Sequence, residues 1–242
     1  MNTKSAIPIH PFLIKNIEEA PTDLPVVLLL RHAARGEIAP GSTGDELPIT
    51  EDGHDLARAL GALLGGRLMT LHTSPVLRCV QTAKALLEGA NRQIDVVESR
   101  LLGDPGVFVL DGDLAWTNWE SMGHEGVIRH IVSEAYALPG MAQPDDAAWR
   151  LVNFMLGAAP VSGLHVFVTH DILVTATLSR LQRRIYKPSD WPHFLEGAFL
   201  WQKHQSLHVA YRDMGGRVEI ERQAQGRIVP AQCRSRRVET VR

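Results

Sequence analysis

The chain has 242 residues, of which 45% are hydrophobic and 21% are charged, and its formal net charge is -2. This composition is typical of one large or two small globular domains, and it lacks the basic excess of nucleic-acid-binding proteins. Two distant cysteines, no signal-peptide pattern and no long apolar stretch predict a cytoplasmic protein without membrane, disulfide or cysteine-metal features.

The first buried strand is predicted at residues 26–30, after a proline-containing arm over residues 1–24. The strand runs directly into Arg31, His32 and Arg35. Open α/β sheets bind ligands at the carboxyl ends of their strands, and guanidinium groups pair well with phosphate oxygens. This cluster therefore predicts a phosphoryl-binding site, with a charged, solvated loop as the alternative.

A loop over residues 37–46 precedes a helix for which Thr50 is the predicted N-cap. The loop either folds over a bound anion or is a solvated connector. Gly65 and Gly66 are expected to end the helix. Its leucines recur at helical spacing and are expected to face the sheet. They are Leu56, Leu60, Leu63 and Leu64.

A second strand is predicted at residues 67–72, followed by a helix with Ser74 as N-cap and Pro75 in its first position. Arg78 then lies in the first turn or just beyond it. Free backbone N–H groups and the helix dipole attract anions there. Arg78 is therefore a candidate phosphate ligand, with a surface arginine on an amphipathic helix as the alternative.

Residues 94–97 predict a third strand, and about 104–160 predict a helical or irregular cap inserted in the core. Helical spacing occurs at residues 128–138 and 145–156. Such insertions often determine substrate specificity. The three tryptophans of this region are expected in the core of the cap. They are Trp116, Trp119 and Trp149.

The fourth strand is predicted at residues 165–169 and ends in His170 and Asp171, followed by a helix. A structural histidine is the alternative for His170. Residues 206–212 and 217–222 alternate between apolar and polar and predict a β-hairpin. The arginine-rich segment of about 225–242 is expected to form a frayed tail.

Three separate segments thus bring histidine or arginine to a strand end or a helix start. The residues are Arg31, His32, Arg35, Arg78 and His170. Phosphoryl transfer depends mainly on positioning and on neutralising oxygen charges, and a neutral imidazole is a competent nucleophile. Because no metal-ligand motif surrounds these residues, we expect neither a metal nor another cofactor.

Four motifs in this order resemble those of the histidine phosphatase superfamily. They are L-R-H-A-A-R-G (30–36), L-P-I-T-E-D-G (47–53), S-P-V-L-R-C-V-Q-T-A (74–83) and V-T-H-D (168–171). The resemblance implies a single phosphoglycerate-mutase-like α/β domain over residues 1–242. Its central, mostly parallel sheet would be flanked by helices. It also implies a phosphohistidine intermediate.

Position by position, His32 resembles the family's nucleophile. Arg31 and Arg78 resemble the arginines of the phosphate pocket, and His170 resembles its second histidine. Arg35 matches an extra arginine typical of the acid-phosphatase branch. Asp171 matches the aspartate that serves that branch as proton donor.

Two features depart from the acid-phosphatase branch. Ala33 stands where the family has glycine, and alanine lacks glycine's freedom at positive φ. The chain length and low cysteine content suit the phosphoglycerate-mutase-like branch, in which the acid follows the third strand. That segment offers Glu98 and Asp104. Three carboxyl groups therefore stay open as proton donor, with Asp171 favoured over Asp104 and Glu98.

The sequence predicts a metal-independent phosphomonoester phosphatase that acts on a small phosphorylated metabolite. Two alternatives use the same residues: a phosphotransferase or mutase, and a non-catalytic phosphate-binding protein. No feature indicates a nucleic-acid or membrane partner.

Overall fold

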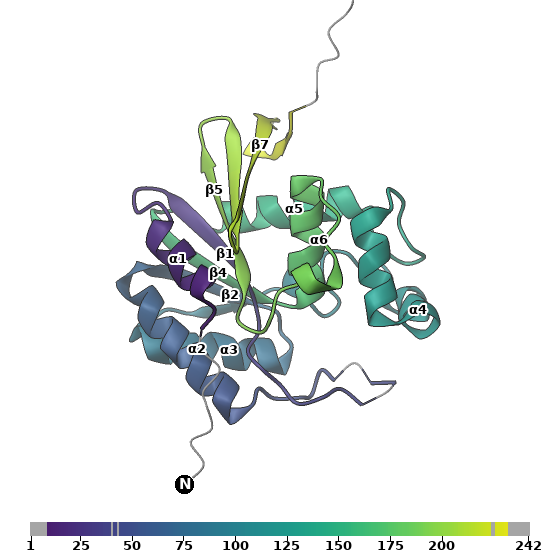
Figure 1. The fold of residues 1–242 in the computed structure, drawn as a ribbon, viewed down its shortest axis with the longest axis horizontal. Helices are drawn as coiled ribbons and strands as arrows, with labels where there is room; N and C mark the ends of the chain where they lie inside the picture. Colours follow the sequence, from purple (N-terminus) through teal and green to yellow (C-terminus); the bar gives the residue numbers. More distant parts are fainter. Residues whose placement is uncertain (1–8, 40, 43, 224–225, 232–242) are drawn as a thin grey trace, which may run out of the picture.

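The computed structural model describes residues 9–39, 41–42, 44–223 and 226–231, and an eight-stranded mixed sheet runs through these residues (Figure 1). The strands lie in the order β3-β2-β4-β1-β5-β6-β7-β8. Their bounds are β1 Pro25–Arg31, β2 Leu68–Thr73, β3 Val96–Glu98, β4 Gly163–Thr169, β5 Gly197–Lys203, β6 Ser206–Tyr211, β7 Met214–Arg222 and β8 Ile228–Pro230. The first four strands of the spatial order are parallel, and β5 to β8 extend the sheet in antiparallel fashion. The predicted α/β fold with a mostly parallel core is confirmed.

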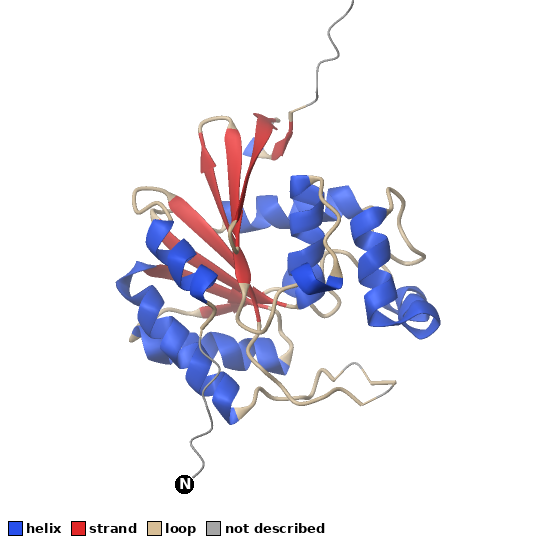
Figure 2. Cartoon of the chain, in the orientation of Figure 1, coloured by secondary structure: helices blue, strands red, loops and turns tan. Residues whose placement is uncertain are grey.

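Helices cover both faces of this sheet (Figure 2). The six α-helices of the described residues are α1 Pro11–Glu19, α2 Glu51–Leu64, α3 Leu77–Ala90, α4 Gly112–Ser133, α5 Pro144–Gly157 and α6 Asp171–Gln182. Residues of α1, α2 and α3 share one hydrophobic core, and residues of α4, α5 and α6 share the other. Because Leu28 and Leu30 face the first core while Val27 and Leu29 face the second, β1 is apolar up to Leu30.

The parallel strands end at the same edge of the sheet, which places the residues that follow them close together. Arg31 pairs with Thr169 in the β1–β4 register, and the His32 N–H donates to the Thr169 carbonyl at 2.9 Å. The Ser74 N–H likewise donates to the Val168 carbonyl at 2.9 Å. The strand ends predicted to form the site do meet.

The N-terminal region differs from the predicted irregular arm, because Pro11–Glu19 form helix α1. Pro11 takes the first helical position, where its missing N–H is tolerated, and the His10 side chain accepts the Phe12 N–H. Leu13 and Ile17, one helical turn apart, are buried against the sheet. The prolines that suggested an arm here start a helix.

Three further local predictions are wrong. Leu63 does not face the sheet and is 45% exposed. The N-cap of α3 is Val76 rather than Ser74, whose hydroxyl instead accepts the Val76 N–H at 3.3 Å. In the cap, the helical stretch predicted at residues 128–138 is part of a longer helix, α4, which begins at Gly112 and ends at Ser133. A kink at Gly123 (φ 68°) interrupts the helical pattern of α4.

The C-terminal region follows its prediction in part. The β-hairpin is confirmed, but Gly215 and Gly216 belong to β7 and pair with β6, so the turn is shorter. Within the predicted tail, Ile228–Pro230 form the edge strand β8. Residues 225 and 232–242 of that tail, and Cys233 with them, lie outside the described residues. No helix in the described part of the chain has the length and apolar character needed to cross a membrane.

Candidate active site

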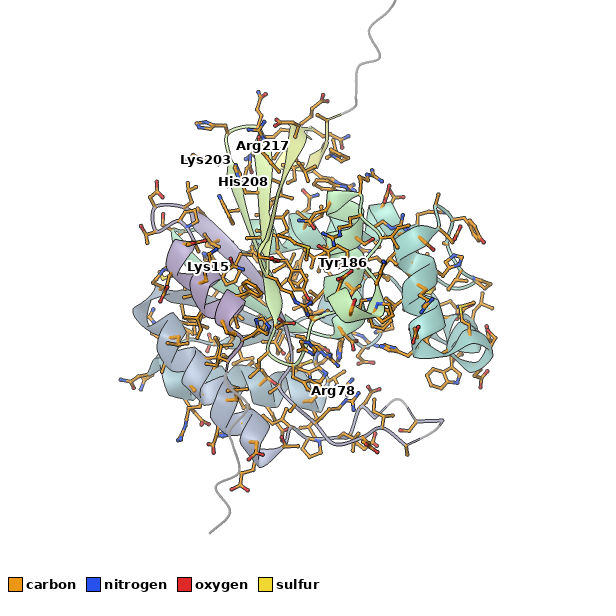
Figure 3. All side chains as sticks on the ribbon, viewed as in Figure 1. Lys15, Arg78, Tyr186, Lys203, His208 and Arg217 are labelled. Carbon is orange, nitrogen blue, oxygen red and sulfur yellow. The ribbon has the colours of Figure 1, made fainter. Side chains whose placement is uncertain are left out.

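A cavity of about 550 Å³ opens at the carboxyl end of β1, β4 and β2. The loop after β1, the start of α3, the loop after β3 and the first half of α4 surround it. All five predicted phosphate-site residues line it, namely Arg31, His32, Arg35, Arg78 and His170. Figure 3 shows Arg78 at this end of the sheet, between α3 and the long loop that follows β1.

Arg78 connects the two histidines. Its Nε donates to Nε2 of His32 at 3.1 Å, and its Nη2 lies 3.2 Å from Nδ1 of His170. Its Nη1 donates to the Gly44 carbonyl at 2.7 Å, which holds the loop after β1 against α3. Because a guanidinium only donates, both contacted imidazole nitrogens must carry lone pairs.

The partner of the other ring nitrogen fixes the same tautomer for His32. Nδ1 of His32 lies 2.7 Å from the Ala33 carbonyl, which only accepts, so this nitrogen carries the proton. Nε2 of His170 lies 3.2 Å from the Ser74 hydroxyl. His32 therefore presents the lone pair of Nε2 to the cavity, as a nucleophilic imidazole must.

Burial keeps both imidazoles neutral. His32 is 3% exposed, and desolvation, reinforced by His170 and Arg78, holds its pKa well below the ordinary value. Desolvation and the Arg78 charge lower the pKa of His170 to about 3. A neutral imidazole predominates above its pKa, so these lowered values keep both rings unprotonated in mildly acidic solution.

This predicts that two histidine signals will not titrate in the usual range. In an NMR titration from about pH 8 to about pH 5, exposed histidines should shift near their ordinary pKa. The signals of His32 and His170, assigned by His32→Ala and His170→Ala, should stay at their neutral positions. A His32 midpoint near the ordinary value would contradict the buried, neutral nucleophile.

Asp171 pairs with Arg31 at the start of α6. Arg31 Nη2 lies 2.9 Å from Asp171 Oδ2, while Arg31 Nη1 donates to the Pro192 carbonyl at 2.7 Å. The Phe194 ring lies 4.3 Å below the Arg31 guanidinium. These contacts fix the guanidinium beside the cavity, where it can bind a phosphoryl oxygen.

A second partner of Asp171 is His124 of α4, which the sequence did not single out. Its Nε2 lies 3.3 Å from Asp171 Oδ1, and its Nδ1 accepts the Trp119 indole N–H at 3.4 Å. Burial alone would raise the pKa of Asp171. The hydrogen bond from His124 and the charge of Arg31 outweigh it and hold that pKa below its ordinary range. The resting carboxyl group is therefore ionised.

The other two acid candidates lie differently. Asp104 lines the cavity, but its carboxylate is half exposed and lies 3.7 Å from Arg100 Nη2. Glu98 is exposed in β3 and is not part of the described cavity lining. Arg35 reaches the cavity with its Nη1 bonded to the Gly36 carbonyl at 2.6 Å.

Two short residues shape the site. Ala33 does not adopt a positive φ, so alanine fits where the family has glycine, and its N–H donates to Thr82 Oγ1 at 3.0 Å. Gly103, with φ 150°, is required: a Cβ there would lie 2.4 Å from Ser74 Oγ and 2.5 Å from His170 Nε2. This glycine lets the loop after β3 close onto His170.

The tryptophans of the cap divide between two roles. Trp149 is buried in the core as predicted, whereas Trp116 and Trp119 are half buried and line the cavity. The prediction that all three form a core is wrong for Trp116, because the first half of α4 faces the cavity. Trp119 lines the cavity and also packs against the core. Within the described residues, no three histidine, cysteine, aspartate or glutamate side chains gather in an arrangement that could hold a metal ion.

Comparisons with known proteins agree with this geometry. Residues 27–195 match the family model of the histidine phosphatase superfamily (branch 1). The fold is similar to mycobacterial glucosyl-3-phosphoglycerate phosphatase, with 19% identity, a TM-score of 0.54, and coverage of 78% of this chain and 98% of that one. It is also similar to phosphoglycerate mutase from Bacillus anthracis, with 16% identity, a TM-score of 0.52, and coverage of 82% and 94%.

A third solved structure with this fold is a histidine-to-alanine variant of phosphoserine phosphatase from Entamoeba histolytica in complex with phosphoserine. It has 14% identity, a TM-score of 0.52, and coverage of 77% of this chain and 96% of that one. A search of curated proteins found no significant match to this sequence. At these identities the solved structures establish the shared fold.

Proposed function

The chain belongs to the histidine phosphatase superfamily, and from this membership we propose that it is a metal-independent phosphomonoester phosphatase acting on a small phosphorylated metabolite. The observation that carries the proposal is the neutral His32, whose Nε2 lone pair faces the cavity beside Arg78. Arg31 and Arg78 supply positive charge at the same end of the cavity. A metal is then not required to neutralise the phosphoryl oxygens.

In the proposed first step, Nε2 of His32 attacks phosphorus, and the bond between phosphorus and the alcohol oxygen breaks. The phosphoryl group moves to His32, and the alcohol leaves with a proton from the enzyme. In the second step, water attacks phosphorus, the bond between phosphorus and Nε2 breaks, and one water proton returns to the group that supplied the first. Inorganic phosphate leaves, and neutral His32 is restored. The arginine forks bind the oxygens that carry the charge in both steps.

We propose Asp171 as the group that delivers the proton, with His124 as the residue that positions and recharges it. The resting carboxyl is ionised, but an incoming phosphate brings negative charge beside it and takes up part of the Arg31 charge. Both effects raise the pKa of Asp171 in the complex. His124 Nε2 lies 3.3 Å from Asp171 Oδ1, and the side chain is half exposed. When the Trp119 bond to Nδ1 opens, Nδ1 can take a proton from solvent while Nε2 passes its proton to the carboxylate.

Loss of the proton donor should depend on the leaving group. We expect Asp171→Asn to slow hydrolysis of an alkyl phosphate by roughly 10² or more. Hydrolysis of p-nitrophenyl phosphate, whose leaving group needs no proton, should slow far less. His124→Gln should show a weaker form of the same pattern, since it removes the relay and keeps a donor to Asp171. Steady-state kinetics with a series of leaving groups measures the dependence.

Asp104→Asn is the matched control, because it changes a carboxyl group of the same cavity lining. It should leave the leaving-group dependence unchanged. If Asp104→Asn instead shows that dependence and Asp171→Asn slows both substrates equally, Asp104 is the donor.

Turnover of p-nitrophenyl phosphate in EDTA tests the proposal as a whole. Sustained phosphate release supports a metal-independent phosphatase. Activity only with a sugar-phosphate donor and acceptor pair would indicate a phosphotransferase or mutase. Tight binding of inorganic phosphate without turnover would indicate a binding protein. Activity that is lost on chelation and returns only with a divalent ion would contradict metal independence.

A further inference from the structure

The first half of α4 forms an aromatic wall of the catalytic cavity. Four of its residues line the cavity at helical spacing, namely Gly112, Ala115, Trp116 and Trp119. The indole N–H of Trp116 donates to Glu120 at 3.1 Å, and that of Trp119 donates to His124 at 3.4 Å. Because both N–H groups are already paired, this wall offers a substrate the surfaces of two indole rings.

The cavity therefore has two chemically different parts. One part holds the guanidinium groups of Arg31 and Arg78 and the two neutral histidines. The rest of the lining holds the tryptophans and further apolar side chains, namely Ile38, Val76, Pro105, Val109, Ile172 and Leu173, together with polar residues such as Ser42, Asp45 and Asp104. With a volume of about 550 Å³, the cavity has the size of sites that enclose whole small molecules, so it extends well beyond a phosphate.

Carboxylates at the exposed rim of the cavity disfavour a second anionic group on the substrate. Asp45 and Asp104 line the cavity with side chains 54% and 51% exposed. The one other arginine of the lining, Arg35, has its Nη1 bonded to the Gly36 carbonyl. Asp45 Oδ1 lies 3.8 Å from Arg78 Nη1, and Asp104 Oδ1 lies 3.7 Å from Arg100 Nη2. A carboxylate or second phosphate on the alcohol part would compete with these carboxylates for the same guanidinium groups, which disfavours it.

We infer that the substrate is a phosphomonoester whose alcohol part carries an uncharged aromatic ring, which stacks against Trp116 while the phosphate contacts Arg78. The inference rests on the proposed phosphatase function for the hydrolysis of the ester. The stacking contact can be measured by binding alone, without turnover. Flat rings gain stacking energy on an indole in addition to the area they bury. Aliphatic alcohols lack that gain.

Binding and turnover are measured separately with matched compounds. Calorimetric titration compares 2-naphthylmethylphosphonate with propylphosphonate, which carry the same head group and cannot be hydrolysed. We expect the naphthyl compound to bind at least about tenfold more tightly. Turnover compares 2-naphthylmethyl phosphate with propyl phosphate, two esters of primary alcohols, and kcat/KM should show the same preference.

Trp116→Ala should remove most of the preference for the naphthyl compound and change propylphosphonate binding less than about twofold. Trp116→Phe should keep part of the preference, which controls for disturbance of α4. Tyr136→Ala changes a cap aromatic that is 61% exposed and should have no effect. A substitution at Trp119 would also remove the hydrogen bond from its indole N–H to His124 Nδ1.

Equal binding of the two phosphonates, or an equal loss of both in Trp116→Ala, would overturn the inference whether or not the protein is active. Selective naphthyl binding without phosphate release from either ester would overturn the proposed phosphatase function and leave the aromatic subsite standing. Phosphate release from both esters at equal kcat/KM, with equal binding of the two phosphonates, would overturn the aromatic subsite and leave the proposed phosphatase function standing.

Discussion

Replacing His32 with alanine should abolish the phosphoenzyme and lower kcat on the order of 10⁶-fold, as removal of a catalytic nucleophile does in other enzymes. Rapid acid-free quenching of the wild-type protein with ³²P-labelled substrate should trap a phosphoprotein. Its bond should be labile in acid and stable in base, as expected for a phosphoramidate. The same experiment with His32→Ala should yield no label.

The physical reason is that His32 combines an unprotonated Nε2 at the cavity with a ring direction fixed by two hydrogen bonds. The Ala33 carbonyl accepts the proton on Nδ1, and Arg78 Nε donates to Nε2, which lies at the cavity. The other cavity histidine that is buried, His170, points its lone pair at Arg78 from Nδ1. It is therefore placed to bind a phosphoryl oxygen in concert with Arg78.

His165 provides a matched control for this experiment. It is a buried histidine on β4 whose ring contacts Thr70 and the Val161 carbonyl, and it does not line the catalytic cavity. His165→Asn should label like the wild type if it folds, as checked by circular dichroism. Label retained by His32→Ala at wild-type stoichiometry would place the nucleophile elsewhere.

The part of the site that follows strands could be predicted from sequence. His32 and His170 each follow an apolar run with one polar residue between, and parallel neighbours such as β1 and β4 end at one edge of the sheet. Arg78 could be placed there because Ser74, Pro75 and the helical pattern put it in a first turn. That expectation held although the N-cap was misassigned by two residues, since Arg78 is the second residue of α3.

The part of the site that comes from the cap could not be predicted. One half of α4 faces the cavity, the other half packs on α6 and the core, and Gly123 turns the chain between them. Neither half repeats long enough to give a clear helical period. His124 therefore carried no signal, and Trp116 was assigned to the core of the cap, although both residues line the cavity.

The protonation state of Asp171 could not be predicted from the sequence either. Burial and neighbouring cations act on the pKa of Asp171 in opposite directions, and their balance depends on where His124 and Arg31 lie. A sequence gives the residue types but not these distances. The structure supplies both partners, and their joint effect lowers the resting pKa.

Arg78→Ala should lower kcat/KM by about 10²- to 10³-fold, because the loss of one preorganised donor to a developing charge costs about 2.7–4 kcal/mol. Arg78 makes three diverging contacts, to His32, His170 and the Gly44 carbonyl, and its side chain is 8% exposed. Arg58→Ala removes an exposed arginine of α2 outside the cavity lining and should leave kcat/KM unchanged. Near-normal kinetics for Arg78→Ala would place Arg78 outside the reaction.

Arg78→Lys separates the charge of this residue from its geometry. The Arg78 charge is one of the causes that lower the pKa of His170 and of His32, so Arg78→Ala should shift both histidine titrations upward, toward 6.5. A lysine keeps the charge and should leave those titrations nearly in place. It lacks the fork that reaches both rings and a phosphoryl oxygen at once, so it should recover little of kcat. Histidine NMR titrations and steady-state kinetics on the same variants compare the two effects. If lysine restores kcat as fully as it restores the titrations, charge alone explains Arg78, and the fork contacts to His32 and His170 contribute nothing to the reaction.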